Sequence, residues 1–386
     1  MTADLVIRPI NGAADRRRFV DLVWEVYRND PAWVPPLKSE LLALITPGKN
    51  PWFEHAEAAF WLAERDGTPV GRISAQVDTL VQKHMAPGTG QWGMFELLDG
   101  ETEAGPALIA TAEEWLRKRG MTRALGPFSL SVWDEPGLLI QGFGTPPTAM
   151  MGHHRPSYEA IIEHAGYAKA RDLLSYDLDI RNERVPIVRR LIAAGERSGR
   201  IRMRQVEKRH FARDAHIILT LLNDAWSDNW GFVPLTEAEI AYAGKKLKPV
   251  IYEDLVYICD VAGDDGVFRP AAFMITLPDL NELSRDLNGS LFPFGWAKLL
   301  WRLRRPRVER IRVPLMGVAK SLQNTRIAGQ LAFMMIEACR KPSVQVYGAS
   351  SGEFGWVLED NQGMISIAKM SGATINKVYR IYERAL

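Results

Sequence analysis

Apolar residues recur along the chain in an order that appears twice. The stretch LVIRPI (Leu5–Ile10) predicts a short strand, followed by a helix with apolar positions at Phe19, Leu22, Val23 and Val26. The stretch IRMRQV (Ile201–Val206) predicts a second such strand, and its helix has apolar positions at Ile217, Ile218, Leu221 and Leu222. Both halves of the chain therefore begin with a strand and an amphipathic helix.

The order of later elements also repeats. Related loops follow the two helices, RNDPAWVPPLKSE (Arg28–Glu40) and SDNWGFVPLTEAE (Ser227–Glu239). Hairpin-like strands come next, at Phe60–Val77 and Leu255–Thr276, and each pair contains an Asp-Gly turn signal. Each half then closes with a helix, a glycine stop and a strand, and the stops are Gly166 and Gly372. We interpret this repetition as two homologous α+β domains.

The repeat sets the expected domain boundaries. The first domain covers residues 1–180 and the second covers residues 201–386. An arginine-rich stretch, residues 181–200, predicts a basic helical linker whose charged face is solvated.

Composition restricts the class of protein. With 386 residues the chain is long enough for two domains, and its 47% hydrophobic residues are typical of a globular protein. The formal charge of +2 indicates no bulk attraction to nucleic acid. The two cysteines, Cys259 and Cys339, have no metal-ligand spacing, so a reducing cytoplasm is expected. Because the N-terminal stretch has no apolar core and no run of about 18 apolar residues follows, neither a signal peptide nor a membrane span is predicted.

The order of elements in each half resembles the GNAT superfamily of acyl-CoA-dependent N-acyltransferases. In that family a central strand leads into a turn with the pattern Gln/Arg-x-x-Gly-x-Gly/Ala, and backbone N–H groups at the next helix start hold the coenzyme A diphosphate. Here Arg310–Val318 corresponds to the strand and Asn324–Gly329 to the turn. Gly329 matches the last glycine, but Ile327 stands where the first is usual. The alternative is an ordinary loop before a core helix.

The resemblance implies a fold and a coenzyme site. Each domain is expected to have a mixed, mostly antiparallel central sheet flanked by helices. Asn361 and Gly372 reproduce the spacing of a second family motif, although Ala368 occupies the position of its tyrosine acid. The first domain has no recognisable phosphate turn, so we expect it to be a degenerate acceptor-side or structural domain and the second to bind acyl-CoA. The residues implied to bind the coenzyme are Gly317, Val318, Asn324, Thr325, Arg326, Ala328, Gly329 and Asn361.

Acyl transfer from a thioester to an amine requires a base for the ammonium, an oxyanion donor and an acid for the thiolate. The predicted base is Glu353, with His153 or its neighbour His154 as alternatives, and Tyr382 or Tyr379 are candidate acids. Adjacent histidines in an extended chain point to opposite sides, so only one of them can face a site. The expected substrate-binding residues are Trp133, Asp134, Tyr158 and Trp230. No metal site is predicted, because no third ligand follows the histidine pair at a useful spacing.

The stretch SLFPFGWAKLLWRLRRPRVERIR (290–312) has the composition of an interfacial helix. Its predicted apolar face contains Trp296, Leu299, Leu300 and Leu303, opposite Lys298, Arg302 and Arg305. The alternative is a surface helix packed on its own domain. A tandem chain with this helix is similar to the bacterial GNAT-type ceramide synthases. That similarity implies transfer of a long acyl chain to a lipid amine such as a sphingoid base, by a cytoplasmic enzyme peripherally attached to the inner face of an anionic membrane.

Two other functions remain open from the sequence. One is a soluble small-amine N-acetyltransferase, and the other is a catalytically silent module that binds coenzyme A. Nucleic-acid binding is not expected, because the basic residues form no recognised reading motif. A nucleotide pyrophosphohydrolase is also not expected, because Glu113-Glu114 stands without the further acidic residues that would hold divalent metals.

Overall fold

The computed structural model describes residues 4–182 and 185–386, and it divides into two compact units. Unit 1 comprises Met1–Leu173, Ser284–Gly295 and Lys377–Leu386, and unit 2 comprises Leu174–Leu283 and Trp296–Asn376. These units differ from the expected ranges 1–180 and 201–386. Strand β7 (Ala168–Asp179) ends in unit 2, whereas strand β13 (Thr374–Ala385) ends in unit 1. Residues 183 and 184 of the expected linker lie outside the described residues.

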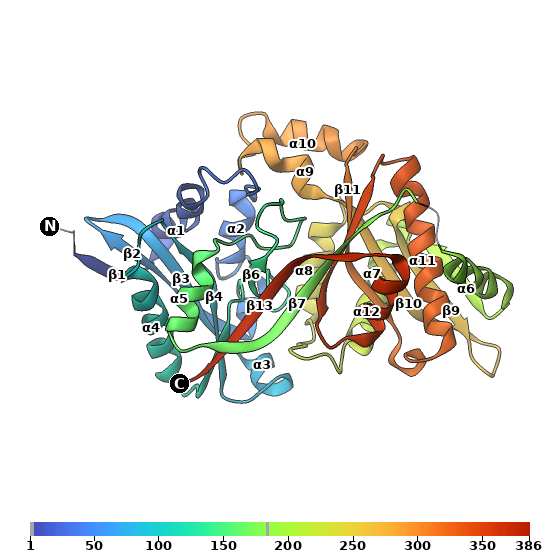
Figure 1. Ribbon diagram of the computed structural model, residues 1–386, viewed down its shortest axis with the longest axis horizontal. Coiled ribbons are helices and arrows are strands. Elements are labelled where there is room, and N and C mark those ends of the chain that lie inside the picture. The colour runs from blue at the N-terminus through green and yellow to red at the C-terminus, as the bar shows by residue number, and fades with distance from the viewer. Residues whose placement is uncertain (1–3, 183–184) are drawn as a thin grey trace. The chain divides into compact units, whose positions relative to one another are not determined.

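Unit 1 is built on a mixed, mostly antiparallel sheet (Figure 1). Its neighbouring strands follow the order β1-β2-β3-β4-β5-β13, with β6 also paired to β13, and only β4 and β5 are parallel. The strands are β1 (Leu5–Pro9), β2 (Ala56–Arg65), β3 (Thr68–Asp78), β4 (Thr89–Leu97), β5 (Arg123–Gly126) and β6 (Leu138–Gln141). The helices are α1 (Gly12–Val26), α2 (Lys38–Leu44), α3 (Thr79–His84), α4 (Ala104–Arg117) and α5 (Ser157–His164).

Helices cover both faces of the unit 1 sheet. Alternate residues of β2 point to opposite faces, so Trp61 belongs to the core beneath α4 and Phe60 to the core beneath α1. The apolar stripe predicted for the first helix is confirmed, because its members Phe19, Leu22 and Val23 are buried in the second of these cores.

Unit 2 repeats this architecture. Its strands follow the order β7-β12-β11-β10-β9-β8, and β11 and β12 are parallel while the pairs from β11 to β8 are antiparallel. The strands are β8 (Ile201–Gln205), β9 (Val256–Ala262), β10 (Phe268–Pro278), β11 (Arg310–Val318) and β12 (Ser351–Leu358). The helices are α6 (Pro186–Arg197), α7 (Phe211–Ala225), α8 (Glu237–Leu247), α9 (Leu280–Ser284), α10 (Gly295–Arg304), α11 (Arg326–Gln345) and α12 (Gln362–Ser371). The predicted α+β fold with two similar domains is confirmed.

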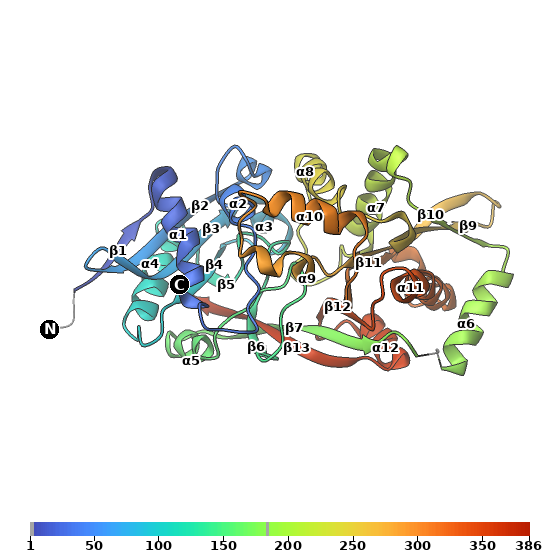
Figure 2. The ribbon, with the colours of Figure 1, turned by 90° about the horizontal axis from the view of Figure 1, so that it is seen from above.

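Helix α6 lies in the region of the expected basic linker, and its exposed basic residues include Arg189, Arg190 and Arg197. It lies beside α11 in both ribbon views (Figures 1 and 2). Gly195 allows this approach, because a Cβ there would lie 2.4 Å from Sδ of Met334. Val188 on the same helix is buried. The helix itself is confirmed, but one side of it packs within unit 2.

In unit 1, the chain itself fills the space beyond the end of the β4–β5 pairing. These parallel strands pair only from Thr89–Arg123 to Gln91–Leu125. The backbone N–H of Phe128 then donates to the carbonyl of Trp92 at 2.8 Å. A Cβ added at Gly93 would lie 1.8 Å from the carbonyl oxygen of Phe128, so only glycine permits this approach.

Gly93→Ala is therefore expected to lower the free energy of unfolding by about 3 kcal/mol, the upper end of the usual cost of overpacking. Urea denaturation followed by tryptophan fluorescence measures this change. Gly144→Ala is the matched control, because a Cβ at Gly144 has no heavy atom within 4 Å. Equal stability of the two variants would contradict the close approach at Gly93.

Candidate functional site

The strands β11 and β12 of unit 2 separate halfway along their length. Their parallel pairing runs from Arg310–Ser351 to Val313–Phe354 and goes no further. Pro314 comes next in β11, and proline has no N–H to continue a ladder. On the other strand, Gly355 lies against β7, where an added Cβ would be 3.0 Å from Cα of Ser175. The two strands therefore part and leave a gap in the sheet.

The gap opens into a pocket whose walls come from both strands, from the segment after α7 and from α12. Pro314 and Met316 line it on the β11 side, and Trp356 on the β12 side. Trp226, which follows α7, donates its indole N–H to the carbonyl of Met316 at 3.2 Å. Asn361 also lines the pocket, where its side chain accepts the backbone N–H of Met364 and caps α12.

The turn after β11 is held in place by α7. The backbone N–H of Lys320 donates to Asp224 at 2.8 Å, and the amide of Gln323 donates to the carbonyls of Ala225 and Val318 at 2.9 and 3.0 Å. Asn324 has a positive φ of 63°, which redirects the chain into α11. Thr325 caps the helix by accepting the N–H of Ala328.

The first turn of α11 presents backbone donors to an open surface. The first four N–H groups of a helix have no partner within the helix, and the helix dipole adds partial positive charge. The side chain of Arg326 is exposed, and a Cβ at Gly329 would meet no heavy atom within 4 Å. The structure therefore brings Asn324, Thr325, Arg326, Ala328 and Gly329 together in a cradle suited to phosphate. Gly317 and Val318 lie at the end of β11, paired with Phe273 and Ala272 of β10.

Glu353, the predicted base, lies inside β12. The strand begins at Ser351, because Ser351–Phe354 pair with β11, and Glu353 stands opposite Arg312 and is fully buried. One carboxylate oxygen accepts from Arg312 at 3.1 Å, and the other accepts from Asn376 at 2.7 Å. The carboxylate thus joins β11 to β12 just below the point where the strands part.

A second pocket adjoins the first between the sheet and helices α11 and α12. The two pockets share Val313, Met316, Phe354 and Met364. The second pocket has a cavity volume of about 50 Å³ and is lined almost wholly by apolar side chains. Glu353 lies on its wall with both oxygens hydrogen-bonded.

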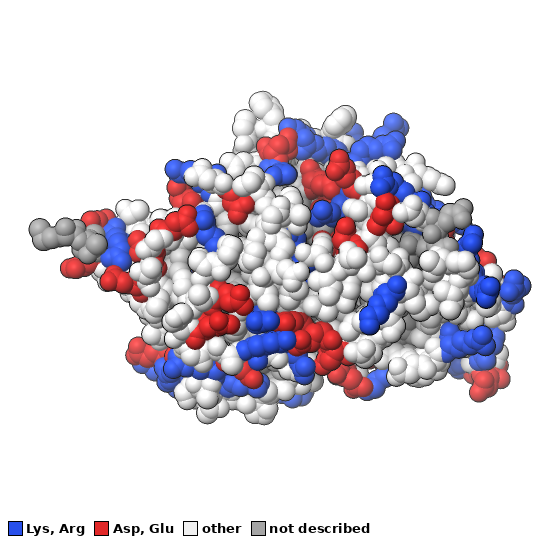
Figure 3. Space-filling model, in the orientation of Figure 1, with Lys and Arg blue, Asp and Glu red and all other residues white. Residues whose placement is uncertain are grey.

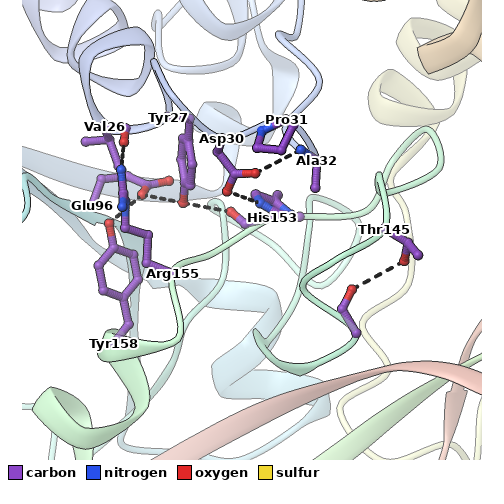
Figure 4. A network of polar contacts seen from close by, with 12 residues as sticks. Val26, Tyr27, Asp30, Pro31, Ala32, Glu96, Thr145, His153, Arg155 and Tyr158 are labelled. Atoms are coloured by element: carbon purple, nitrogen blue, oxygen red, sulfur yellow. Dashed lines mark hydrogen bonds and ion pairs between the residues drawn. The ribbon is translucent and has the colours of Figure 1, made fainter.

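Unit 1 contains a buried polar network centred on Glu96 of β4 (Figure 4). One oxygen of its carboxylate accepts from the hydroxyl of Tyr27 at 2.7 Å and from that of Tyr158 at 3.0 Å. The other oxygen lies 4.0 Å from the guanidinium of Arg72. Burial raises the pKa of Glu96 to about 7, although Arg72 and the tyrosine bonds act against this rise. A carboxyl group with this pKa can change its proton near neutral pH.

His153 extends this network. Its Nε2 lies 2.9 Å from Asp30, and its backbone carbonyl accepts from Tyr27 (Figure 4). Burial lowers the pKa of His153 despite the opposing effect of Asp30, so the ring is neutral at pH 7. With Nε2–H donating to Asp30, the buried Nδ1 retains a lone pair and has no partner among the described residues. An imidazole oriented by a carboxylate has the arrangement of a general base.

Only one of the adjacent histidines belongs to this network, as expected. Nδ1 of His154 accepts the backbone N–H of Leu139 at 3.0 Å, and burial lowers the pKa of this ring to about 3. The neutral His154 ring therefore serves to hold the loop next to β6.

The other predicted site residues are dispersed. Tyr382 is buried in unit 1, where its hydroxyl lies 3.0 Å from Glu159 and burial raises its pKa, whereas Glu353 belongs to unit 2. Tyr379 is also in unit 1 and donates to the carbonyl of Gly152. Trp230 is half-buried in unit 2, in the loop between α7 and α8.

Trp133 and Asp134 line a pocket of about 190 Å³ in unit 1, together with Arg72 and Glu135. Three non-glycine residues on its wall, Met94, Glu135 and Met150, have positive φ. Such backbone conformations gather at functional sites, where the surrounding structure holds them. The guanidinium of Arg72 is buried beside this pocket, donates to the carbonyl of Phe19 and leaves Nε without a described partner.

Sequence reasoning missed Glu96, Tyr27 and Arg72. The available signal was a charged residue inside the apolar strand QWGMFELL (Gln91–Leu98), since carboxylates are rarely buried unless they are paired.

Among residues 4–182 and 185–386, no group of three His, Cys, Asp or Glu could hold a metal ion. Within the same residues, no helix is long and apolar enough to cross a membrane.

Comparison with known proteins decides the family. No protein-family model matches the chain. It is 42% identical to the bacterial ceramide synthase of Caulobacter vibrioides over 387 aligned residues, which cover 100% of this chain and 98% of that protein. It is 39% identical to protein YghO of Escherichia coli, over 99% of this chain and 95% of the relative. The chain belongs to the bacterial ceramide synthase family.

The fold agrees with this assignment. A tandem GNAT protein from the clavulanic acid biosynthesis pathway, solved without acetyl-CoA, superposes with a TM-score of 0.53 at 13% identity. The match covers 99% of this chain and 98% of that one. The chain thus has the fold of a tandem GNAT protein, as the sequence resemblance implied.

The raised pKa of Glu96 leads to a prediction about stability. The folded state keeps its proton up to about pH 7, whereas the unfolded chain loses it above about pH 4.5. The stabilisation is therefore complete below pH 4.5 and is lost as the pH rises through 7. Relative to Glu96→Gln, the wild type should lose about 3 kcal/mol of unfolding free energy between pH 4.5 and 8.

Urea denaturation at several pH values measures this difference. Glu103→Gln on the surface of unit 1 is the control and should track the wild type. Parallel stability curves for wild type and Glu96→Gln across this range would show that Glu96 is ionised in the folded protein.

Proposed function

We propose that this chain transfers a long acyl group from acyl-CoA to the amine of a lipid such as a sphingoid base, forming an amide and releasing coenzyme A. The observation that carries the proposal is the 42% identity to a bacterial ceramide synthase over the whole chain. A ceramide is the N-acyl amide of a sphingoid base, so a family member with the same elements throughout is expected to perform the same class of transfer.

The thioester belongs in the gap between β11 and β12 under this proposal. The coenzyme phosphates lie at the first turn of α11, where backbone N–H groups and the exposed Arg326 supply positive charge. The pantetheine arm then follows the parted strands beside Asn361 and Trp356. In unit 1 the corresponding space contains the backbone of Phe128, which supports assigning coenzyme binding to unit 2.

The remaining predicted residues have proton-transfer and acceptor roles in the proposal. His153 has a ring nitrogen left to accept a proton, whereas both oxygens of Glu353 already accept hydrogen bonds. The hydroxyl of Tyr382, the candidate acid, donates to Glu159 at 3.0 Å. On the acceptor side, Asp134 and Glu135 are the carboxyl groups of the unit 1 pocket that could contact an ammonium group, beside the guanidinium of Arg72. Trp133, Tyr158 and Trp230 complete the proposed acceptor-side residues.

Gly329→Asp tests the coenzyme site. The new carboxylate would face the phosphates, and the open space at Gly329 allows the side chain without a clash. Binding of coenzyme A should weaken by more than roughly tenfold, about 1.4 kcal/mol, in isothermal titration calorimetry. Gly329→Asn, which has the same shape without the charge, should bind far more tightly than the aspartate variant.

The same proteins are then assayed with palmitoyl-CoA and sphinganine by thiol release and mass spectrometry of the amide. The proposal expects N-palmitoyl product from the wild type and a matching loss in Gly329→Asp. Coenzyme A binding without any amide product would identify a silent binding module. Turnover of small soluble amines alone would identify the acceptor as a small molecule.

We also propose that residues 290–307 attach the protein to an anionic membrane. Five large apolar side chains of this segment are exposed: Phe292, Phe294, Trp296, Leu300 and Trp301. Figure 3 shows this uncharged surface at its upper edge, at the position of α10 and the preceding loop in Figure 1, next to basic side chains. Aromatic residues beside arginines are typical of interfacial segments.

The apolar face of α10 differs from the one predicted. Leu299 and Leu303 turn inward and pack on a core of unit 2, leaving Trp296, Leu300 and Trp301 exposed. Arg302 also has an internal contact, because its guanidinium donates to the carbonyl of Leu283 at 2.7 Å. The exposed cations of this segment therefore include Arg304, Arg305 and Arg307.

Replacing Arg304 and Arg305 with glutamine should weaken binding to anionic vesicles by roughly thirtyfold in a co-sedimentation assay, since each surface cation contributes about 1 kcal/mol. Trp301→Ala should weaken the binding further by removing apolar area from the lipid. Arg189→Gln with Arg190→Gln on α6 makes the same charge change elsewhere and should have no comparable effect. Equal vesicle binding by both double variants would show that residues 290–307 are an ordinary surface segment without a membrane role.

A further inference from the structure

The apolar pocket behind the gap in unit 2 has no role in coenzyme binding or in proton transfer. It runs from Val313 and Phe354, where β11 and β12 part, to Cys339 on α11 and Ser371 at the end of α12. Because α11 runs antiparallel to β11, the pocket extends away from the phosphate cradle and toward the start of both strands. It therefore lies in line with the gap but beyond the place proposed for the thioester.

The pocket is continuous with the gap. Four residues line both spaces, and two of them, Val313 and Phe354, form the last pair of the β11–β12 ladder. A thioester carbonyl at the point where β11 and β12 part would have the coenzyme on the side of the gap. Its hydrocarbon chain would lie on the side of the apolar pocket.

The chemistry of the wall suits a hydrocarbon. The polar groups at its edge are already engaged, because Glu353 accepts from Arg312 and Asn376, and Arg340 donates to Glu337 and the carbonyl of Ile180. Cys339 is equally occupied, since its thiol contacts the carbonyl of Leu255. A chain of methylene groups needs no hydrogen bonds from its surroundings, so none of these groups would be left without a partner.

The pocket can also widen. Met274, Met316 and Met364 lie on its wall, and unbranched methionine side chains change rotamer at low cost. Gly352 adds no side chain to the strand side, where a Cβ would crowd two wall residues, at 3.1 Å from Ile180 and 3.4 Å from Ile311. The 50 Å³ cavity is thus bordered by side chains that can change rotamer.

We propose that this pocket binds the hydrocarbon chain of the transferred acyl group, and that its far end at Cys339 and Ser371 limits the length of the chain. The inference rests on the proposed acyltransferase function, and it specifies a long-chain acyl thioester as the donor. It also separates two parts of donor binding, since the phosphate cradle holds every coenzyme A ester equally and the pocket distinguishes them by chain length.

Ser371→Phe tests the length limit by placing a ring at the far end of the pocket. Ser371 is only partly buried, so the core of unit 2 need not be repacked. Dissociation constants are measured for coenzyme A, octanoyl-CoA and palmitoyl-CoA with wild type and variant. The variant should bind coenzyme A and octanoyl-CoA as the wild type does and lose palmitoyl-CoA affinity by roughly tenfold or more, because several methylene groups no longer fit.

Ser366→Phe is the matched control, since it makes the same substitution on an exposed position of α12. Ile336→Ala, which enlarges the pocket from α11, is the second variant and should shift the preference toward longer chains. An unchanged length preference in both Ser371→Phe and Ile336→Ala, with coenzyme A bound normally, would overturn the pocket assignment alone. Failure of the wild type to bind any coenzyme A ester would instead overturn the proposed function.

Discussion

The candidate site depends on the interruption of one parallel strand pair. Strands β11 and β12 share four residue pairs and then diverge. Pro314 cannot donate the next ladder hydrogen bond, and Gly355 lets β12 follow β7 closely. A continuous sheet at this point would close both the gap and the entrance to the apolar pocket. Arg312 and Glu353 lie one residue below the last pair and tie the strands together there, so the position of the opening is defined by their ion pair.

Unit 1 has the same strand topology, but the space beyond its short parallel pair is filled. Strands β4 and β5 also pair in parallel over a few residues, but the backbone of Phe128 occupies the space beyond. The two halves therefore share the arrangement of strands and differ in what fills the break. This difference explains why a repeated fold need not carry a repeated ligand site.

Two buried glutamates illustrate how environment decides the state of a carboxyl group. Glu353 faces an arginine and an asparagine amide, which supply both charge and donors to an ionised carboxylate. Glu96 accepts from two tyrosine hydroxyls, and its nearest cation is 4.0 Å away, so burial dominates and raises its pKa to about 7. The first carboxylate is suited to holding strands together. The second can exchange a proton near neutral pH, next to the His153–Asp30 pair.

The sequence alone determined the repeat, the α+β class, the strand Arg310–Val318 and the turn that leads into α11. These features depend on local periodicity, turn residues and spacing, which are written in short stretches of the chain. For residues 290–312 the sequence left open whether the helix contacts lipid or packs on its own domain, and it did not predict the inward turn of Leu299 and Leu303. Only the tertiary structure decided that Glu353 pairs with Arg312, that Phe128 fills the break in unit 1, and that Tyr382 and Glu353 belong to different units. The network of Glu96, Tyr27 and Tyr158 likewise joins residues more than sixty positions apart. Such partners are set by the register of distant strands and by the exchange of strand ends between units, and no local pattern in the sequence records them.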